Sequence, residues 1–204
     1  MPSLYQCKPA FQTCLRPVVN QLAAWKIIPN QVTLTAVLLS AAGGLAIACF
    51  PQAQWPLVCL PSILLARMGL NAIDGMLARE HNLKSNLGCV LNELGDVVSD
   101  AALYLPFSLL PGITADWVVL VVVLAIITEM MGVLGLAIAQ QRAYDGPIGK
   151  SDRALVFGAI ALVLGLGVNP AGWLNPVWAI VVVLQVWTIL NRVRVSLQEV
   201  QPCK

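Results

Sequence analysis

The chain carries the stretch Asn71-Ala-Ile-Asp74-Gly75-Met-Leu-Ala78-Arg79 and, after eight further residues, the stretch Gly88-Cys-Val-Leu-Asn92-Glu-Leu-Gly-Asp96. Charged and amide side chains are costly to keep inside strongly apolar sequence, so where they occur they point to a functional site. On helices, Asn71 and Asp74 share one face at a spacing of three, and Asn92 and Asp96 share another at a spacing of four. The pattern therefore predicts two neighbouring antiparallel helices that bring four oxygen-bearing side chains together.

The sequence around these two stretches is that of a membrane protein. Hydrophobic residues make up 58% of the chain and charged residues only 11%, against about 25% charged residues in soluble domains. Long apolar runs favour helices over barrel strands, and helices need about 20 such residues to cross a bilayer. We therefore expect an all-α protein with six transmembrane helices, over residues 31–50, 56–79, 88–110, 117–139, 154–169 and 174–191.

Basic residues are distributed unevenly between the predicted loops. They lie before the first span, after the last span and in two alternate loops: Lys8, Arg16, Lys26, Arg79, Lys84, Arg142, Lys150, Arg153, Arg192, Arg194 and Lys204. The positive-inside rule then places both termini and the polar site on the cytoplasmic side, where a soluble nucleotide could reach it. This loop bias also accounts for the net charge of +2, which gives no reason to expect a nucleic-acid partner.

The segment before the first span has helical periodicity of its own. Apolar residues recur at intervals of three or four, at Leu4, Cys7, Phe11, Cys14 or Leu15, Val18, Leu22 and Trp25. This pattern predicts an amphipathic helix over residues 3–27 that lies in the membrane interface; the alternative is a solvated leader. Because no linker or repeat interrupts the chain, we expect one domain over residues 1–204, with the six-helix bundle over 31–191.

The residue types of the polar site suit a hard divalent cation. Its oxygen-bearing side chains are Asn71, Asp74, Asn92 and Asp96. Oxygen ligands of this kind favour Mg²⁺, Mn²⁺ or Ca²⁺ over zinc, and such an ion commonly binds a nucleotide diphosphate as well. Gly75 leaves space beside Asp74 for a ligand, and Arg79 can bind phosphate through two donors. The alternative is a purely structural polar seam between two helices.

The spacing resembles the signature of the CDP-alcohol phosphotransferase (CDP-alcohol phosphatidyltransferase) family, which reads Asp-x2-Asp-Gly-x2-Ala-Arg-x8-Gly-x3-Asp-x3-Asp. Every interval matches, with Asn71 and Asn92 in place of the first and third Asp. The resemblance implies an enzyme of phospholipid biosynthesis in a bacterial inner membrane, with its active site facing the cytoplasm. Such an enzyme transfers a phosphatidyl or other phosphoalcohol group from a CDP-alcohol, such as CDP-diacylglycerol, to an alcohol acceptor and releases CMP. Members are often homodimers, so the resemblance also implies a homodimer among membrane lipids.

The resemblance also implies roles for individual residues. One or two Mg²⁺ or Mn²⁺ ions would be held by Asn71, Asp74, Asn92 and Asp96, and Asp96 would also accept the proton of the acceptor hydroxyl as the catalytic base. The CDP site would be lined by Asp74, Gly75, Ala78, Arg79 and Gly88. Lys150 and Arg153, from the predicted loop before the fifth span, would bind the phosphate of the acceptor where it has one; the alternative is an ordinary basic loop.

The two asparagines leave three interpretations open. An amide is neutral and a weaker ligand than a carboxylate, so the site either works with one ion or recruits other acids. Glu93 is the nearest candidate, although it lies about 100° round the helix from Asn92. The third interpretation is that catalysis has been lost and that the protein binds lipid or nucleotide only.

A second group of charges lies deeper in the predicted spans. Arg67, Asp100 and Glu129 each lie roughly 17 Å from the cytoplasmic end of their span, at 1.5 Å per residue. A lone buried charge is costly, so we expect the three side chains to pair. They form either the floor of the pocket, where they recognise the acceptor, or a structural ion pair that fixes three helices.

Overall fold

The computed structural model describes residues 8–198, and helices form its regular secondary structure. They are α1 (Lys8–Ala24), α2 (Pro29–Cys49), α3 (Trp55–Glu80), α4 (Asn86–Tyr104), the 3₁₀ helix η2 (Leu105–Leu109), α5 (Ala115–Ala139), α6 (Lys150–Gly165) and α7 (Leu174–Gln198). Within these described residues there is no strand, which confirms the all-α fold. Leu4, Cys7 and Lys204 from the predictions above lie outside the described residues.

Four helices are long and apolar enough to cross a membrane, namely α2, α3, α5 and α7. The other two predicted spans also form helices, but they do not qualify by length and composition alone. The reason in α4 is its three carboxylates, from Glu93, Asp96 and Asp100, and the reason in α6 is its length of 16 residues.

Several predicted boundaries differ from the structure, since α6 ends at Gly165 and α7 continues to Gln198. Two further differences have a clear local reason. The helix expected over 88–110 leaves α geometry after Tyr104, because Pro106 has no N–H to donate to the preceding turn. The helix expected to start at 154 starts at Lys150 instead. There the carboxylate of Asp152 accepts a hydrogen bond of 2.8 Å from the backbone N–H of Gly149, which caps the first turn.

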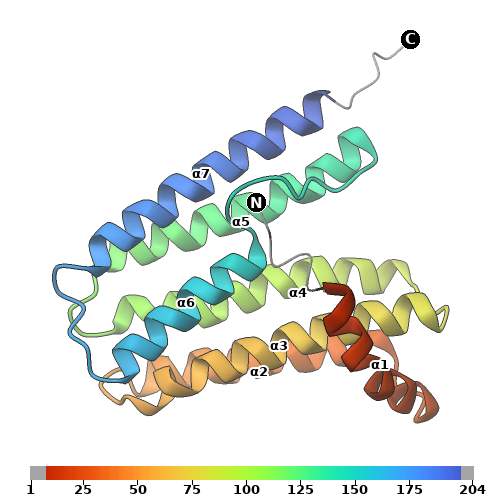
Figure 1. Ribbon diagram of the computed structural model, residues 1–204, viewed down its shortest axis with the longest axis horizontal. Coiled ribbons are helices and arrows are strands. Elements are labelled where there is room, and N and C mark those ends of the chain that lie inside the picture. Colours follow the sequence, from red (N-terminus) through yellow and green to blue (C-terminus); the bar gives the residue numbers. More distant parts are fainter. Residues whose placement is uncertain (1–7, 199–204) are drawn as a thin grey trace.

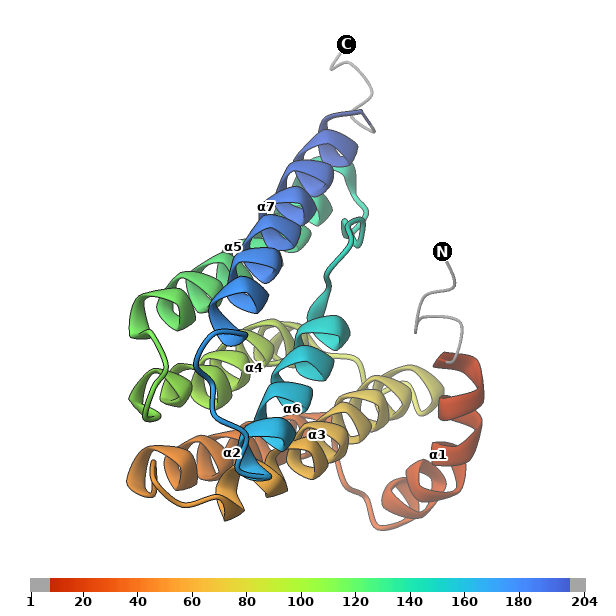
Figure 2. The same ribbon diagram turned by 60° about the vertical axis from the view of Figure 1, so that its left-hand side comes forward.

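The helices form two groups that meet at the ion pairs described below. In the first group, α2 packs against α3 and α4, and α6 lies on α3 (Figure 1). In the second group, α5 and α7 run side by side and cross over the first group at an angle (Figure 2). The segment of residues 140–149 returns from the end of α5 to the start of α6, so it links the two groups.

The core lies at the end of the bundle away from the two polar stretches. There the ring of Phe157 stacks on Tyr104 at a centroid distance of 3.8 Å and lies 5.2 Å from both Phe107 and Trp178. These rings join α4, η2, α6 and α7. Nearby, α2 and α4 approach so closely that a Cβ on Gly44 would overlap the backbone carbonyl of Ala102. This packing fixes α4 against its neighbours and thereby positions its polar half.

Helix α1 packs against the polar end of α3. Val19 is fully buried in a small apolar cluster that includes α3 residues, with Leu15 and Leu22 packed against it. Phe11 and Trp25 from the same predicted stripe stay exposed. The apolar surface of α1 is thus divided between the protein and its surroundings, and its position in the membrane interface stays a prediction.

Candidate active site

The antiparallel pair α3 and α4 brings the two polar stretches to the same end of the molecule. Helix α3 carries Asn71, Asp74, Gly75, Ala78 and Arg79 in its last turns, and α4 carries Gly88, Asn92 and Asp96 in its first turns. The chain reverses between them over residues 81–85, so the end of one helix lies beside the beginning of the next (Figure 1). The two helices run antiparallel as expected and bring Asn71 and Asp96 into contact, but α2 is the helix that packs against both of them.

Asp74 is buried and held by a third helix. Only 4% of the residue is exposed, and its Oδ2 accepts a hydrogen bond of 2.7 Å from the hydroxyl of Thr33 in α2. Sequence reasoning missed Thr33, although a hydroxyl one turn into an otherwise apolar helix is a signal that could have found it. The contact fixes the direction in which the Asp74 carboxylate points.

Asp96 is surrounded by hydrogen-bond donors and cations. Its Oδ1 accepts a hydrogen bond of 2.9 Å from the side-chain amide of Asn71. The same oxygen forms an ion pair with the ammonium group of Lys150. Arg67 lies 3.9 Å from the same oxygen and donates to the backbone carbonyl of Asp96 at 3.0 Å. Asn92 is half-buried and makes no side-chain hydrogen bond with another described residue.

Two glycines allow close approach at the predicted CDP site. A Cβ on Gly75 would lie 3.1 Å from the guanidinium of Arg79, whose side chain folds back over this position. A Cβ on Gly88 would lie 2.9 Å from the side-chain oxygen of Asn30, at the start of α2. Ala78 is half-buried and Arg79 is exposed. Arg79 has no ion-pair partner among residues 8–198, so its charge is available to a ligand.

The deeper charges pair differently from the prediction. Arg67 contacts Asp100 at 2.5 Å, but Glu129 reaches the pair only through Arg153. One nitrogen of Arg153 lies 3.1 Å from Asp100 and 2.7 Å from Glu129. Arg153 was expected at the mouth of the site, but it is fully buried because it belongs to the first turn of α6. It is therefore not placed to meet the phosphate of an acceptor at the surface.

The ion pairs continue from Glu129 towards the surface through Arg142, which the sequence prediction left in an ordinary loop. The guanidinium of Arg142 contacts Glu129 at 2.9 Å and also pairs with Glu93. Burial acts to lower the pKa of Arg142, but the carboxylates of Glu93 and Glu129 outweigh it and raise that pKa. Glu93, considered above as a replacement ligand beside Asn92, is thus already paired.

Together these contacts form one ion network. Its members are Arg67, Glu93, Asp96, Asp100, Glu129, Arg142, Lys150 and Arg153. Four cations face four carboxylates, so the network is neutral as a whole. It connects α3, α4, α5 and α6 below the predicted CDP site. Among the described residues, the Nε and Nη1 atoms of Arg153 and the Nε of Arg67 have no hydrogen-bond partner.

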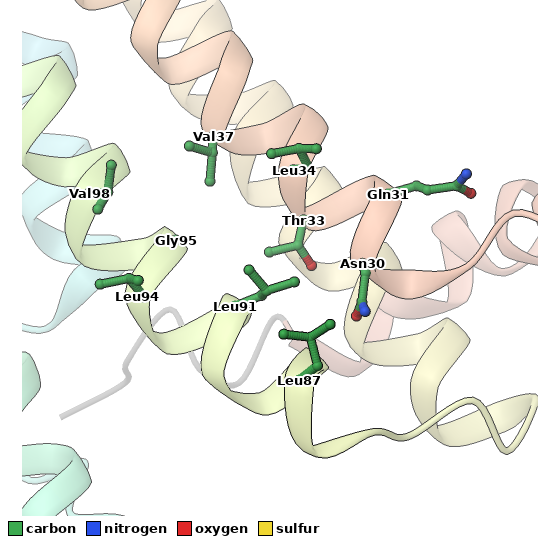
Figure 3. A pocket seen from close by; sticks show the side chains of 10 residues that line it. All are labelled: Asn30, Gln31, Thr33, Leu34, Val37, Leu87, Leu91, Leu94, Gly95 and Val98. Carbon is green, nitrogen blue, oxygen red and sulfur yellow. The ribbon is translucent and has the colours of Figure 1, made fainter.

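An apolar groove adjoins the polar site between α2 and α4 (Figure 3). Its volume is about 370 Å³, and it is lined by Asn30, Gln31, Thr33, Leu34, Val37, Leu87, Leu91, Leu94, Gly95 and Val98. Thr33, which holds Asp74, is part of this lining, so the groove begins at the polar site. Leu34 and Leu94 are more than half exposed, so the groove is open at the side of the bundle.

Most of the chain matches one known family at the level of sequence. A family model described as CDP-alcohol phosphatidyltransferase matches residues 26–192. The inner membrane protein YnbA of Escherichia coli (strain K12) is 46% identical over 192 residues, which cover 94% of this chain and 95% of that protein. An uncharacterized protein of Aquifex aeolicus (strain VF5) is 33% identical over 103 residues, which cover 50% of this chain and 48% of that protein.

Solved structures share the fold at low sequence identity. A Mycobacterium tuberculosis phosphatidylinositol phosphate synthase in complex with manganese and citrate superposes with a TM-score of 0.75, at 18% identity and with 92% of each chain covered. The same synthase with CDP-DAG bound gives a TM-score of 0.68 at 19% identity, with 87% of this chain and 89% of that chain covered. At these identities, the likeness establishes the arrangement of the helices.

Proposed function

The chain belongs to the CDP-alcohol phosphatidyltransferase family, and from this we propose that it transfers a phosphatidyl group from CDP-diacylglycerol to an alcohol acceptor and releases CMP. Like the family, it is a membrane enzyme of phospholipid biosynthesis. One observation carries the proposal. Asp74 and Asp96 lie at the same end of the antiparallel helices α3 and α4, and the Arg79 side chain folds back over Gly75, next to Asp74. Thr33, which donates to Asp74, also lines an apolar groove. A lipid with a charged nucleotide head group needs a polar site for the head group and an adjoining apolar groove for its acyl chains.

The residues of the site fit a magnesium or manganese ion. Asp74 and Asp96 offer carboxylates, and Asn71 and Asn92 offer amide oxygens. The described residues contain no cluster of three or more His, Cys, Asp or Glu side chains of the kind that encloses a metal completely. Mg²⁺ commonly uses one or two carboxylates and takes its remaining ligands from phosphate and water. When bound, such an ion would neutralise the charge of the diphosphate. The manganese in the mycobacterial synthase supports this choice of ion.

We assign the reaction steps to side chains as follows. The hydroxyl oxygen of the acceptor attacks the phosphorus that carries diacylglycerol, and a new P–O bond forms there. The bond from this phosphorus to the oxygen that bridges to CMP breaks, and CMP leaves with the electron pair. The carboxylate of Asp96 accepts the hydroxyl proton. Arg79 binds the departing phosphate, and Gly75 leaves room for the ligand beside Asp74.

The ion network forms the floor of the acceptor side in this proposal. Asp100 and Glu129 hold Arg67 and Arg153 in fixed positions below Asp96. In this proposal Arg153 holds Asp100 and Glu129 in place. It does not bind the phosphate of an acceptor at the surface, as the sequence suggested. Rigid side chains below the site would hold the acceptor hydroxyl in line with the phosphorus. Alignment of the reacting atoms lowers the activation barrier of the transfer.

We place an acyl chain of the substrate in the groove between α2 and α4. The groove is apolar, it opens at the side of the bundle, and it starts at the residue that holds Asp74. Its volume of about 370 Å³ is within the range of sites that bind small ligands. The mycobacterial synthase with CDP-DAG bound is consistent with a lipid substrate for this fold.

Filling the groove should weaken binding of the lipid and spare the chemistry. Leu91→Trp adds bulk between α2 and α4, so we expect KM for a long-chain CDP-diacylglycerol to rise roughly four- to fifteenfold, which is about the contribution of one or two buried methylenes. KM for a short-chain analogue should change little. Leu190→Trp, at an exposed site on α7 (62% exposed), is the matched control. If Leu91→Trp raises KM for the long-chain and the short-chain substrate equally, the acyl chain does not bind in this groove.

The basic residues that remain exposed support the orientation inferred from sequence. Arg142 and Arg153 are used in ion pairs, whereas Arg79, Lys84 and Arg194 stay exposed at the end of the molecule that carries the site. We propose that this end faces the cytoplasm of a bacterium with the termini on the same side, and that α4 and α6 cross the membrane with the other four helices. Residues 1–204 then form a single unit.

The release of CMP tests the proposed function directly. Purified protein in detergent micelles that contain CDP-diacylglycerol and Mg²⁺ or Mn²⁺ should release CMP when the right acceptor is added. A lipid phosphodiester should form in equal amount. Candidate acceptors are glycerol 3-phosphate, serine, inositol phosphate and simple polyols. If the protein binds CDP-diacylglycerol tightly but releases no CMP from it with any of these acceptors, the alternative is favoured, a lipid- or nucleotide-binding membrane protein.

A further inference from the structure

We propose that Lys150 supplies a positive charge to the site that a second metal ion would otherwise provide, so that the enzyme binds one divalent ion per chain. The proposal rests on the proposed function only in placing the ion and the diphosphate at Asp74 and Asp96. Its geometric basis is the ion pair between the Lys150 ammonium group and Asp96. Asp96 is one of the two carboxylates that remain at the site.

The position of Lys150 is set by structure on both sides of it. Gly149 and Asp152 cap the first turn of α6, which fixes the backbone of Lys150. Ile148, two residues before Lys150, is anchored to α7, because its backbone N–H donates to the hydroxyl of Thr188 at 3.2 Å. The side chain of Lys150 is 26% exposed, so its ammonium group lies at the boundary between the ion network and the open site.

Lys150 differs from the neighbouring cations in what it is free to do. Arg153 is shared between Asp100 and Glu129, and Arg142 is shared between Glu129 and Glu93. Each of these guanidinium groups is thus held by two carboxylates. Lys150 pairs with Asp96 alone in the described part of the chain. Its flexible stem and point charge allow it to move between this carboxylate and a phosphate.

The charges near the site can neutralise one divalent ion but not two. When Lys150 turns from Asp96 to the diphosphate, Asp74 and Asp96 together offer two negative charges, which one such ion balances. Asn71 uses its amide N–H to donate to Asp96, so it serves as a hydrogen-bond donor to this carboxylate. A second ion would have only neutral amides as additional ligands, and it would lie near Lys150 and Arg67. Repulsion between such close cations is strong where water is limited.

Manganese binding to the purified protein tests this proposal without any need for turnover. The loss of the free Mn²⁺ signal in electron paramagnetic resonance counts the ions bound per chain in detergent. We expect one ion per wild-type chain. We expect Lys150→Met also to bind one ion, about tenfold more tightly, because a neighbouring positive charge has been removed. CMP release by this variant should nevertheless fall on the order of a hundredfold, because the diphosphate loses a charge partner.

Opposite changes in Mn²⁺ affinity and turnover distinguish this role from others. Lys150→Arg should retain most of both properties. Lys84→Met removes a cation from the exposed turn between α3 and α4, where Lys84 has no ion-pair partner among the described residues, and should change neither property. If Lys150→Met instead raises KM for the acceptor and leaves Mn²⁺ affinity unchanged, Lys150 binds the acceptor and the proposal is wrong.

A combined variant should create the second ion site. With Asn71→Asp, Asn92→Asp and Lys150→Met together, two carboxylates are added and the competing cation is removed, so we expect two Mn²⁺ ions per chain. One ion in this folded variant, or two or none in the wild type, would overturn the proposal. If the triple variant does not fold, the Mn²⁺ affinity of Lys150→Met decides. A single bound Mn²⁺ without CMP release would refute the proposed function and leave the one-ion site intact.

Discussion

Asp74→Asn and Asp96→Asn should each lower the rate of CMP release by about a thousandfold or more, which corresponds to roughly 4 kcal/mol of transition-state stabilisation. Asparagine keeps the shape of the side chain and removes the charge. At Asp74 the hydrogen bond from Thr33 can persist, so the loss reports the missing carboxylate. At Asp96 the variant also removes the proposed proton acceptor. Turnover by the purified variants, with saturating substrate and metal, measures both effects.

A change of the same type elsewhere provides the control. Asp116 is exposed in the first turn of α5, at the end of the bundle away from the site, and Asp116→Asn should retain full activity. All three variants should elute as the parent does in size-exclusion chromatography and show the same helical circular dichroism. More than about a tenth of parental turnover in either site variant, a loss below about 1.4 kcal/mol, would contradict the assignment.

Arg153→Met should destabilise the protein by about 3–5 kcal/mol, which is typical when one partner of a buried ion pair is removed. The side chain of Arg153 is fully buried and lies between Asp100 and Glu129. Methionine fills much of its volume, but it leaves excess negative charge in a place that water hardly reaches. Thermal or denaturant unfolding in detergent should show the loss as a lower midpoint.

The pattern of contacts also predicts how this loss can be repaired. Arg153→Met with Glu129→Gln removes one cation and one acid, so that Asp100 keeps Arg67 and Glu93 keeps Arg142. Most of the lost stability should return. If CMP release does not return with it, the network also orients the acceptor. If the double variant is no more stable than Arg153→Met alone, the network does not act through charge balance.

An exposed ion pair serves as the comparison for this series. Arg16 and Glu80 lie 3.2 Å apart between α1 and α3, with side chains that are 52% and 35% exposed. Exposed pairs contribute about 1 kcal/mol or less, so Arg16→Met should shift the unfolding midpoint far less than Arg153→Met does. Similar shifts in the two variants would mean that burial does not determine the importance of an ion pair in this protein.

The fold could be read from the sequence where one physical signal dominated. Length and hydrophobicity alone predicted α2, α3, α5 and α7. In α4 the same signal competes with three carboxylates: Asp96 and Asp100 pair with cations of other helices, and Glu93 pairs with Arg142 in the segment after α5. The start of α6 was missed because its capping residues, Gly149 and Asp152, also resemble a polar loop. If Gly149 and Asp152 are recognised as the cap of a helix, the helix begins at Lys150 and includes Arg153.

The site could be predicted only as far as helical spacing determines distance. Fixed intervals placed Asn71 with Asp74 and Asn92 with Asp96, because residues on one helix have known separations. The contacts of Lys150 with Asp96 and of Arg142 with Glu93 depend on the path of residues 140–149 between α5 and α6. No periodicity describes such a path. For the same reason, the sequence suggested that Arg67, Asp100 and Glu129 were close but did not reveal the arginine between them.

The side opening of the groove between α2 and α4 has a consequence for how this enzyme meets its two substrates. In the proposed reaction, the lipid substrate would enter the groove from its own leaflet without leaving the bilayer, while a water-soluble acceptor would arrive from the aqueous phase. Encounter with the lipid is then a search in two dimensions. The rate should follow the mole fraction of the nucleotide lipid in the membrane, so that the enzyme responds to the local make-up of the leaflet around it.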